Sequence, residues 1–268
     1  MQDVVDCRKT VERDREEPML LLMNVWSYSL LLLWTLFGIF VFPFVFSGCW
    51  LLSRWPADRV MRLFVWLYGR GWLLLMSPFV RFRRDRMEQI QSGQPCLFVV
   101  NHLSFFDTYC MALLPVYDIT FAVRSWPFQM FWYSGFMRLA RYLDVEGNSW
   151  DDTLAQCQRA FDAGGTVLFF PEGHRSRDGQ LQRFYSGAFK AAIHSGVPLI
   201  PLCIDGTGQL LPPGRKLLRP CQVRLRALEP IDSREFAEND GHIRLRKLVK
   251  RRMAAALEDM RSLESEDE

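Results

Sequence analysis

A histidine and an aspartate five positions apart, His102 and Asp107, are the residues of this chain best suited to do chemistry. A carboxylate that meets an imidazole across a turn fixes the tautomer of the ring and stabilises the imidazolium that forms when the ring takes a proton. Such a pair is a general base that can activate a hydroxyl group. The chain has four histidines among 268 residues, so chance can also supply this spacing. Whether the pair is catalytic must therefore be judged from the residues around it.

A second polar cluster lies about seventy positions downstream, in residues 170–177 (FPEGHRSR). It contains Glu172, Gly173, Arg175 and Arg177. Two arginines on a glycine-containing turn can hold a phosphate or another anion by charge-assisted hydrogen bonds. The alternative is a polar loop whose charges are simply solvated.

The elements that would position these clusters alternate between strands and helices. Apolar runs predict buried strands at residues 96–100, 119–123, 166–170 and 199–203, and alternation predicts a half-exposed strand at 223–227. Helices are expected at residues 107–114, 150–161, 187–195 and 240–257. This order predicts an α/β fold, with a mostly parallel mixed sheet flanked by helices.

Both polar clusters directly follow a predicted strand. In parallel sheets, ligands bind beyond the carboxyl ends of the strands. We therefore expect His102 and Glu172 to face one pocket. Asp107 would lie in the first turn of its helix, where the helix dipole favours an ionised carboxylate.

The N-terminal part of the chain predicts a membrane-embedded helical segment. Residues 1–18 carry four basic and six acidic side chains, whereas residues 19–53 carry no charge. A single helix over that stretch would be about 50 Å long, and the hydrocarbon core of a bilayer is roughly 30 Å thick. We expect either one tilted span with an interfacial piece or a re-entrant hairpin bent near Gly38, Pro43 or Gly48. The alternative is an apolar helix buried in the protein itself.

A basic stretch follows the apolar one. Residues 54–86 carry eight basic and two acidic side chains, which favours the anionic cytoplasmic face of a membrane; the alternative is a solvated charged face. Nucleic acid is not an expected partner, because the cations alternate with Trp, Leu and Phe that need burial. Residues 59–79 suit an interfacial helix with snorkelling arginines or a helix packed on the folded domain.

The expected organisation is a polar N-terminus (1–18), membrane-associated helices (19–79), an α/β domain (80–258) and an acidic tail that frays (259–268). Seven cysteines are scattered, without a CxxC pair or a zinc-like spacing. We infer a reducing compartment and expect no metal site.

Three ordered blocks resemble those of the glycerolipid acyltransferases, the family of 1-acylglycerol-3-phosphate acyltransferases. Residues 101–107 (NHLSFFD) resemble its H-x4-D motif, residues 170–177 its FPEGTRSR block with His174 in place of Thr, and residues 197–201 (VPLIP) its later V-P-[VI]-[VI]-P block. The resemblance covers roughly residues 80–230. It implies a membrane-bound O-acyltransferase that moves a fatty acyl group from acyl-ACP or acyl-CoA to the free hydroxyl of a lysolipid, with no cofactor.

The resemblance also implies residue roles. His102 would deprotonate the acceptor hydroxyl and Asp107 would orient His102, with no acyl-enzyme intermediate. The implied substrate-binding residues are Ser104, Arg124, Glu172, Gly173, Arg175 and Arg177. The implied acceptor is 1-acyl-sn-glycerol-3-phosphate or a related lysophospholipid, and the implied location is a bacterial inner membrane with the active site facing the cytoplasm.

One departure from the family pattern bears on the acceptor. The family's second block ends in an arginine that contacts the acceptor phosphate, and Glu146 or Gly147 occupies that place here. The acceptor would then bind its phosphate mainly through Arg175 and Arg177, or would be a lyso-ornithine-type lipid whose cation pairs with Glu146. Two other classes compete with an acyltransferase: a lipid hydrolase in which His102 activates water, and a non-catalytic lipid-binding relative.

Overall fold

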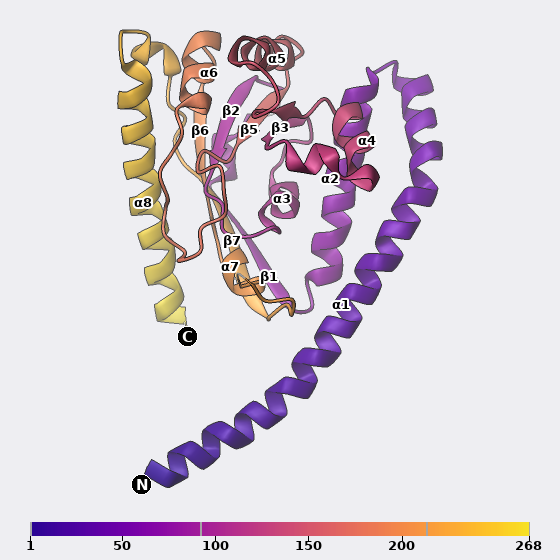
Figure 1. Ribbon diagram of the computed structural model, residues 1–268, viewed down its shortest axis with the longest axis vertical. Helices are drawn as coiled ribbons and strands as arrows, with labels where there is room; N and C mark the ends of the chain where they lie inside the picture. The colour runs from indigo at the N-terminus through magenta and orange to yellow at the C-terminus, as the bar shows by residue number, and fades with distance from the viewer. Residues whose placement is uncertain (1, 92, 213, 268) are drawn as a thin grey trace.

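The fold is built on one seven-stranded sheet with the order β1-β7-β6-β2-β5-β3-β4 (Figure 1). The computed structural model describes residues 2–91, 93–212 and 214–267, with side chains for 18–91, 93–131, 133–212 and 214–262. The strands are β1 (Val80–Asp85), β2 (Cys96–Val100), β3 (Ile119–Val123), β4 (Leu143–Asp144), β5 (Thr166–Phe169), β6 (Leu199–Asp205) and β7 (Cys221–Ala227). Within this sheet only β6 and β7 pair antiparallel. The expected α/β fold with a mostly parallel mixed sheet is confirmed.

Helices cover both faces of the sheet. They are α1 (Gln2–Ser53), α2 (Ala57–Met76), α3 (Asp107–Cys110), α4 (Phe131–Leu139), α5 (Trp150–Asp162), α6 (Gly187–Ser195), α7 (Thr207–Leu210) and α8 (Gly241–Asp267). Short 3-10 helices lie at Met87–Gln89, Met111–Leu113, Trp126–Gln129 and Ser233–Phe236. Helices α5, α6 and α8 share one apolar cluster, and α1 to α4 lie on the other face (Figure 1).

The central strand β2 shows how the sequence builds these two layers. Leu97 and Val99 pack with α5, α6 and α8, whereas Phe98 and Val100 pack with the helices of the opposite face. Alternate side chains of a strand point to opposite faces, so a continuous apolar run is what a sheet covered on both sides requires. All five residues of β2 are buried.

Helix α1 runs without a break through the apolar stretch. The most apolar 18-residue window of its segment Pro18–Ser53 has a mean hydropathy of 2.3, and only 6% of that window is buried. The re-entrant hairpin is therefore wrong: the helix continues past Gly38, Pro43 and Gly48. An apolar helix buried in the protein is also excluded by this exposure. By length and composition, this one helix is able to cross a membrane.

Helix α2 packs on the folded domain rather than lying free with snorkelling arginines. Arg62 is only 6% exposed, and its guanidinium bonds to Asp118 at 2.6 Å, to Asp58 at 3.0 Å and to the Ala140 carbonyl at 2.9 Å. Trp72 on the same helix is fully buried. These contacts fix α1 and α2 to the sheet, since the two helices also pack on each other.

The C-terminal residues differ from the expected frayed tail. Helix α8 continues past residue 258, and Met260 is 1% exposed. Asp259 pairs with Arg226 of β7, and Arg261 pairs with Asp205 at the end of β6. The acidic residue at the start of the tail is thus part of the packed domain.

Candidate active site

The polar clusters follow the carboxyl ends of three neighbouring strands and so lie at one end of the sheet. Strand β2 lies between β6 and β5 and is parallel to both. The three carboxyl ends therefore lie side by side and lead into residues 101–107, 170–173 and 206–207. The neighbouring strand β3, parallel to β5, leads into Arg124 at the same end.

His102 and Asp107 are in direct contact. Nδ1 of His102 lies 2.7 Å from Oδ2 of Asp107. The aspartate is fully buried, whereas the histidine side chain keeps 18% exposure. The imidazole stacks on Phe170 with ring centroids 4.3 Å apart. Phe170 thus packs against the imidazole and Asp107 binds its Nδ1, while part of the ring stays exposed.

The carboxylate of Asp107 accepts three further hydrogen bonds. Oδ2 accepts the backbone N–H groups of Leu103 at 2.7 Å and Ser104 at 2.9 Å. Oδ1 accepts the hydroxyl of Thr207 at 2.5 Å. Ser104 is 2% exposed and forms the turn that holds Asp107, so the structure does not place it as an open substrate contact. A buried carboxylate with this many donors is strongly oriented.

Thr207 is a site residue that the sequence did not reveal. It begins α7, directly after Gly206, whose φ of 86° and close approach to the Gln222 carbonyl leave no room for a Cβ atom. Glycine adopts this backbone conformation readily, whereas residues with a Cβ atom do so rarely. A Gly-Thr pair after a buried strand was the available signal.

Glu172 holds the backbone of the histidine loop. Its Oε1 accepts the N–H of His102 at 2.8 Å, and its Oε2 accepts the N–H of Gln182 at 2.8 Å. The N–H of Ser176 in turn donates to the carbonyl of His102 at 2.7 Å. Burial raises the pKa of Glu172, and the Gln182 and His102 N–H groups offset this only in part. Fully buried, Glu172 positions His102 instead of offering a contact to substrate.

Gly173 completes the turn that carries this carboxylate. Its φ is 71°, and a Cβ at this position would lie 2.9 Å from the ring of Tyr185. The turn thus needs a glycine both for its backbone and for the ring that covers it. Gly173 shapes the loop beside His102.

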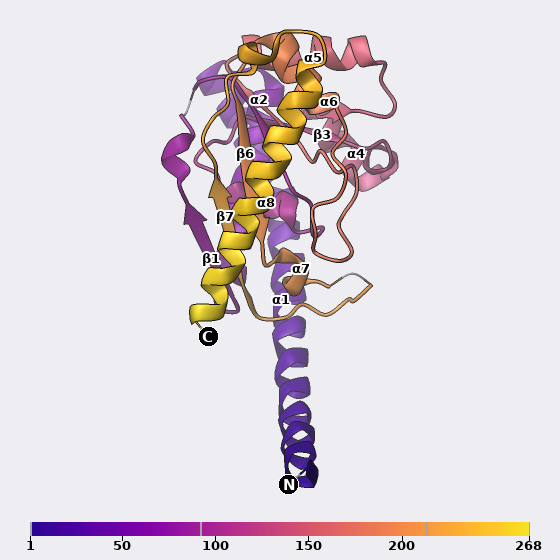
Figure 2. The ribbon, with the colours of Figure 1, turned by 90° about the vertical axis from the view of Figure 1, so that its left-hand side faces the viewer.

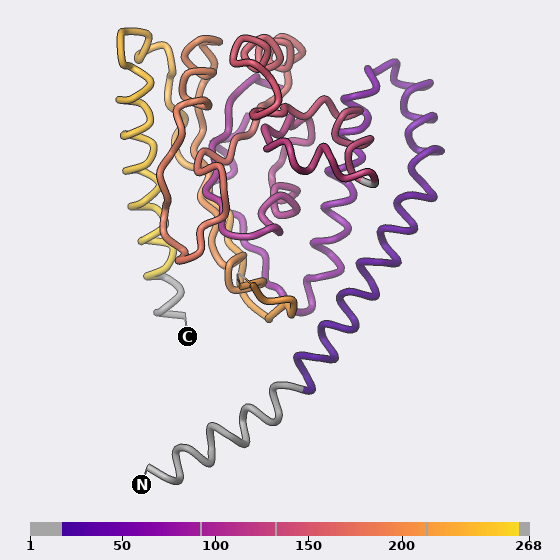
Figure 3. Tube along the Cα trace, in the orientation of Figure 1, coloured from indigo at the N-terminus to yellow at the C-terminus, as the bar shows by residue number. Residues whose placement is uncertain are grey.

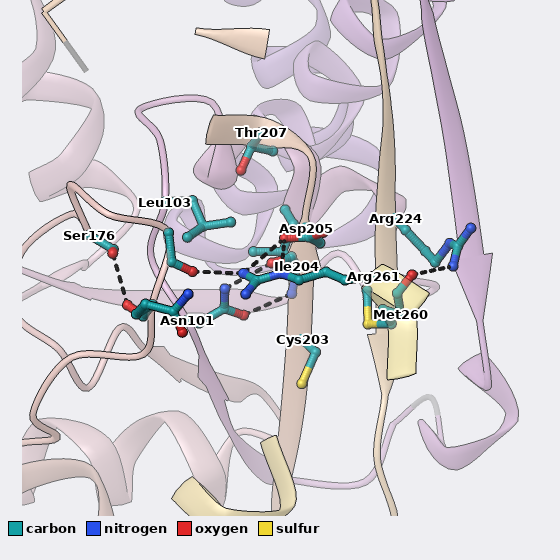
Figure 4. A network of polar contacts seen from close by, with 12 residues as sticks. Asn101, Leu103, Ser176, Cys203, Ile204, Asp205, Thr207, Arg224, Met260 and Arg261 are labelled. Carbon is teal, nitrogen blue, oxygen red and sulfur yellow. Dashed lines mark hydrogen bonds and ion pairs between the residues drawn. The ribbon is translucent and has the colours of Figure 1, made fainter. Parts of the chain in front are cut away.

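Asn101 fixes the start of the histidine loop to β6. Its side-chain amide donates to the Ile204 carbonyl and accepts the Ile204 N–H, both at 2.8 Å (Figure 4). In the same view Arg261 of α8 reaches Asp205, the last residue of β6. The end of β6 is thus held on both sides just before Thr207.

Arg175 and Arg177 are the exposed cations of the second cluster. They flank Ser176, whose N–H bonds to His102. No ion pair among the described residues involves either arginine, so both are available to an anion beside the histidine loop. This arrangement suits a phosphate group.

Arg124 is paired within the protein. Its Nε donates to Glu146 at 2.6 Å, and the two side chains are 52% and 41% exposed. Glu146 also accepts the N–H of Ser125 at 3.0 Å. The pKa of Glu146 is lowered, most strongly by the hydrogen bond from the N–H of Ser125 and next by the hydrogen bond from Arg124. The carboxylate that could have met a cationic lipid head is therefore already bonded to a cation of the chain.

A tight turn occupies the place of the missing arginine. Oδ1 of Asp144 accepts the Ser125 hydroxyl at 2.6 Å and the N–H groups of Glu146 at 3.1 Å and Gly147 at 2.8 Å. Burial alone would raise the pKa of Asp144, but these hydrogen bonds outweigh it and the net shift is downward. The turn holds Glu146 toward Arg124.

The arrangement is suited to proton transfer. With Nδ1 bound to Asp107, Nε2 is the ring nitrogen left to accept a proton from an incoming hydroxyl. The described residues contain no group of three or more His, Cys, Asp and Glu side chains able to hold a metal ion. The buried thiols of Cys96, Cys110 and Cys157 are not part of the site, and burial raises the pKa of each.

Comparisons with known proteins find acyltransferases. A family model described as Acyltransferase matches residues 81–205. The chloroplastic 1-acyl-sn-glycerol-3-phosphate acyltransferase BAT2 of Brassica napus is 32% identical over 180 residues, covering 65% of this chain and 52% of that protein. The 1-acyl-sn-glycerol-3-phosphate acyltransferase of Salmonella typhimurium is 31% identical over 150 residues, covering 53% of this chain and 59% of that protein. The chain thus spans a little over half the length of these curated relatives.

A solved structure shares the fold. The crystal structure of the 1-acyl-sn-glycerophosphate (LPA) acyltransferase PlsC from Thermotoga maritima matches with a TM-score of 0.76 and 24% identity, covering 91% of this chain and 97% of that chain. The matched domain begins within β1 and ends at the last residue of β6, so it contains His102, Asp107 and Glu172. The family model and these relatives show that residues 81–205 are similar to the acyltransferase domain of the 1-acylglycerol-3-phosphate acyltransferases, and the solved structure shows the same fold.

Proposed function

We propose that the protein transfers a fatty acyl group from a thioester to the free hydroxyl of 1-acyl-sn-glycerol-3-phosphate. The contact of 2.7 Å between His102 and the buried Asp107 carries this proposal. It makes Nε2 a base that can take a proton from a hydroxyl, and the carboxylate stabilises the imidazolium that results. No further cofactor is required, because the thioester supplies the activated acyl group.

The reaction proceeds by direct transfer. The acceptor oxygen attacks the thioester carbonyl carbon as its proton passes to Nε2 of His102. The carbon–sulfur bond then breaks, and the imidazolium returns the proton to the departing sulfur. The products are a phosphatidic acid-type lipid and a free thiol, and His102 is neutral again. The donor is acyl-ACP or acyl-CoA in this proposal.

Three observations favour a phosphate-bearing acceptor. Arg175 and Arg177 are exposed beside the histidine loop and suit a phosphate. Glu146, which would have to receive the cation of a lyso-ornithine-type acceptor, is bonded to Arg124 at 2.6 Å. The relatives bear the name 1-acyl-sn-glycerol-3-phosphate acyltransferase, which supports the same acceptor.

We further propose a membrane location with the active site facing the cytoplasm, as in a bacterial inner membrane. The exposed apolar helix α1 supports membrane attachment. The basic residues of the 54–86 stretch support the cytoplasmic side.

Mass spectrometry of the products tests this function. Purified protein receives an equimolar mixture of lysophosphatidic acid, lyso-ornithine lipid and lysophosphatidylethanolamine, with acyl-ACP or acyl-CoA. We expect phosphatidic acid to dominate, and His102→Ala to reduce its formation by at least about a thousandfold, the scale of a lost general base with its partner. Preferred acylation of the lyso-ornithine lipid would overturn the acceptor. Release of free fatty acid without acylated product would favour the hydrolase.

A further inference from the structure

A short basic segment, residues 214–220 (GRKLLRP), lies against the apolar helix α1. It follows α7 and precedes β7, at the same end of the sheet as the candidate site (Figure 3). The segment carries three cations and no acidic residue. Its place beside an uncharged helix is unusual for so many charges, because cations normally avoid apolar surroundings.

Hydrogen bonds dock this segment on α1. The side-chain amide of Asn24 donates to the Leu218 carbonyl at 2.9 Å and accepts the Leu218 N–H at 2.6 Å. The hydroxyl of Tyr28 donates to the Lys216 carbonyl at 2.5 Å. Asn24 is 2% exposed, and a buried amide in an apolar helix is costly unless it is paired. The pairing holds the segment at one level of the helix.

Helix α1 also exposes apolar side chains around the docked segment. Leu21, Leu22, Val25 and Trp26 are 57%, 70%, 58% and 54% exposed. Such an exposed apolar helix surface is suited to contact with lipid. Trp26 and Tyr28 are side chains that prefer the boundary between hydrocarbon and water. The docked segment thus lies where α1 would pass through a membrane–water interface.

The cations of the segment form no ion pair with the described residues. Arg215, Lys216 and Arg219 are exposed, and the salt bridges found among the described residues include none of them. Leu217 lies between them and is 43% exposed. Cations that alternate with an exposed leucine match a surface with phosphates outside and acyl chains beneath.

We propose that residues 214–220 bind the headgroups of anionic phospholipids at the bilayer surface, with Leu217 reaching the acyl boundary. This contact does not depend on the proposed acyl transfer. Its consequence for the site is positional: α7, which leads into the segment, begins with Thr207, the partner of Asp107. The dyad would then face the bilayer surface from which a lysolipid arrives.

Lipid preference around the whole protein tests the proposal. The full chain is reconstituted in phosphatidylcholine liposomes with a fifth of phosphatidylglycerol, and energy transfer from its tryptophans to trace dansyl-phosphatidylglycerol or dansyl-phosphatidylcholine is compared. We expect a preference for phosphatidylglycerol that falls about fivefold or more in the R215Q/K216Q/R219Q variant, since one basic residue near an anionic surface contributes about a fivefold factor.

A variant with equal charge loss elsewhere is the control. K247Q/R251Q/R252Q removes three exposed cations from α8, which lies across the sheet from α1 (Figure 2). It should keep the wild-type preference. The proposal is overturned if the 214–220 variant keeps its preference or if the α8 variant loses as much. The salt dependence of the unmodified protein is a second test. Raising the salt concentration from roughly 0.05 to 0.5 M shortens the range of electrostatic attraction, so the preference for phosphatidylglycerol should fall. A preference that does not fall also overturns the proposal. None of these readouts needs turnover, so an error in the proposed reaction would not imitate these results.

Discussion

The hydroxyl of Thr207 donates a hydrogen bond of 2.5 Å to the buried carboxylate of Asp107, although the two residues are 100 positions apart. The bond joins the end of β6 to the loop after β2. It leaves Oδ2 to His102 and two backbone N–H groups and gives Oδ1 a partner of its own. The hydroxyl of Thr207 bonds to the carboxylate of Asp107 and not to the imidazole, so Thr207 acts by positioning Asp107.

Thr207→Val should lower kcat about ten- to a hundredfold with little change in KM. Valine keeps the shape but leaves Oδ1 of a buried carboxylate without a donor, and a hydrogen bond to a charged group is worth about 1.5–3 kcal/mol. Steady-state kinetics with lysophosphatidic acid measures this. Thr207→Ser should restore most of the rate. An equal loss in Thr207→Ser would contradict this, because the hydroxyl alone would then not account for the effect.

Arg124→Gln should raise KM for lysophosphatidic acid about tenfold and leave kcat nearly unchanged. Nε of Arg124 bonds to Glu146, but the side chain is 52% exposed, so its terminal nitrogens would be able to assist Arg175 and Arg177 in binding the phosphate. The expected loss is then one of uniform binding to the phosphate, which changes KM alone. Arg138→Gln removes the same charge from an exposed position on α4 and is the matched control. An unchanged KM in Arg124→Gln would assign Arg124 to its ion pair with Glu146 only.

Arg62→Met should destabilise the protein by about 3–5 kcal/mol, because it leaves Asp118 and Asp58 without their buried partner. Thermal unfolding in detergent measures this as a lower Tm. Arg59→Met is the control: its side chain is 36% exposed, and its ion pair with Asp118 at 3.4 Å should contribute less than about 1 kcal/mol. Similar shifts in the two variants would contradict the buried role of Arg62.

Cys96, Cys157 and Cys203 should resist alkylation at neutral pH. Burial raises the pKa of Cys96 to about 11 and those of Cys157 and Cys203 to about 12. At pH 8 a thiol with the lower of these values is ionised to roughly 0.1%, and only the thiolate reacts. Iodoacetamide labelling read by mass spectrometry should therefore rise with pH and become rapid only on unfolding. Fast labelling of the folded protein at pH 7 would contradict this.

Local patterns predicted the central part of the fold. The apolar runs at β2, β3, β5 and β6 were recognisable because each of these strands is covered on both faces. Strand β1 was not, since its sequence VRFRRD is mostly charged. It lies at the edge of the sheet, where charged side chains face solvent and protect the open edge. Helix α2 was ambiguous, because the same spacing of apolar and basic residues fits a membrane surface and the surface of a sheet.

Part of the candidate site could likewise be predicted from local sequence and part could not. His102 and Asp107 are near in sequence and share a turn, so their contact could be predicted. The bond from Thr207 depends on β6 lying next to β2, which no local pattern reports. The roles of Glu172 and Ser104 as supports for the histidine loop depend equally on backbone groups that only the folded chain brings into reach.

The pairing of β1 with β7 has a consequence for biosynthesis. Strand β1 is at the sheet edge and pairs with β7 alone, and its Asp85 bonds to Arg226, 141 positions later. At about 5–20 residues per second, a ribosome needs roughly seven to thirty seconds to make the intervening chain. During that interval α1 has already left the ribosome, while the arginine-rich first strand waits beside it without a neighbour. A nascent chain stopped before residue 221 should therefore be cut by protease within 80–86, and one extended past residue 227 should be protected.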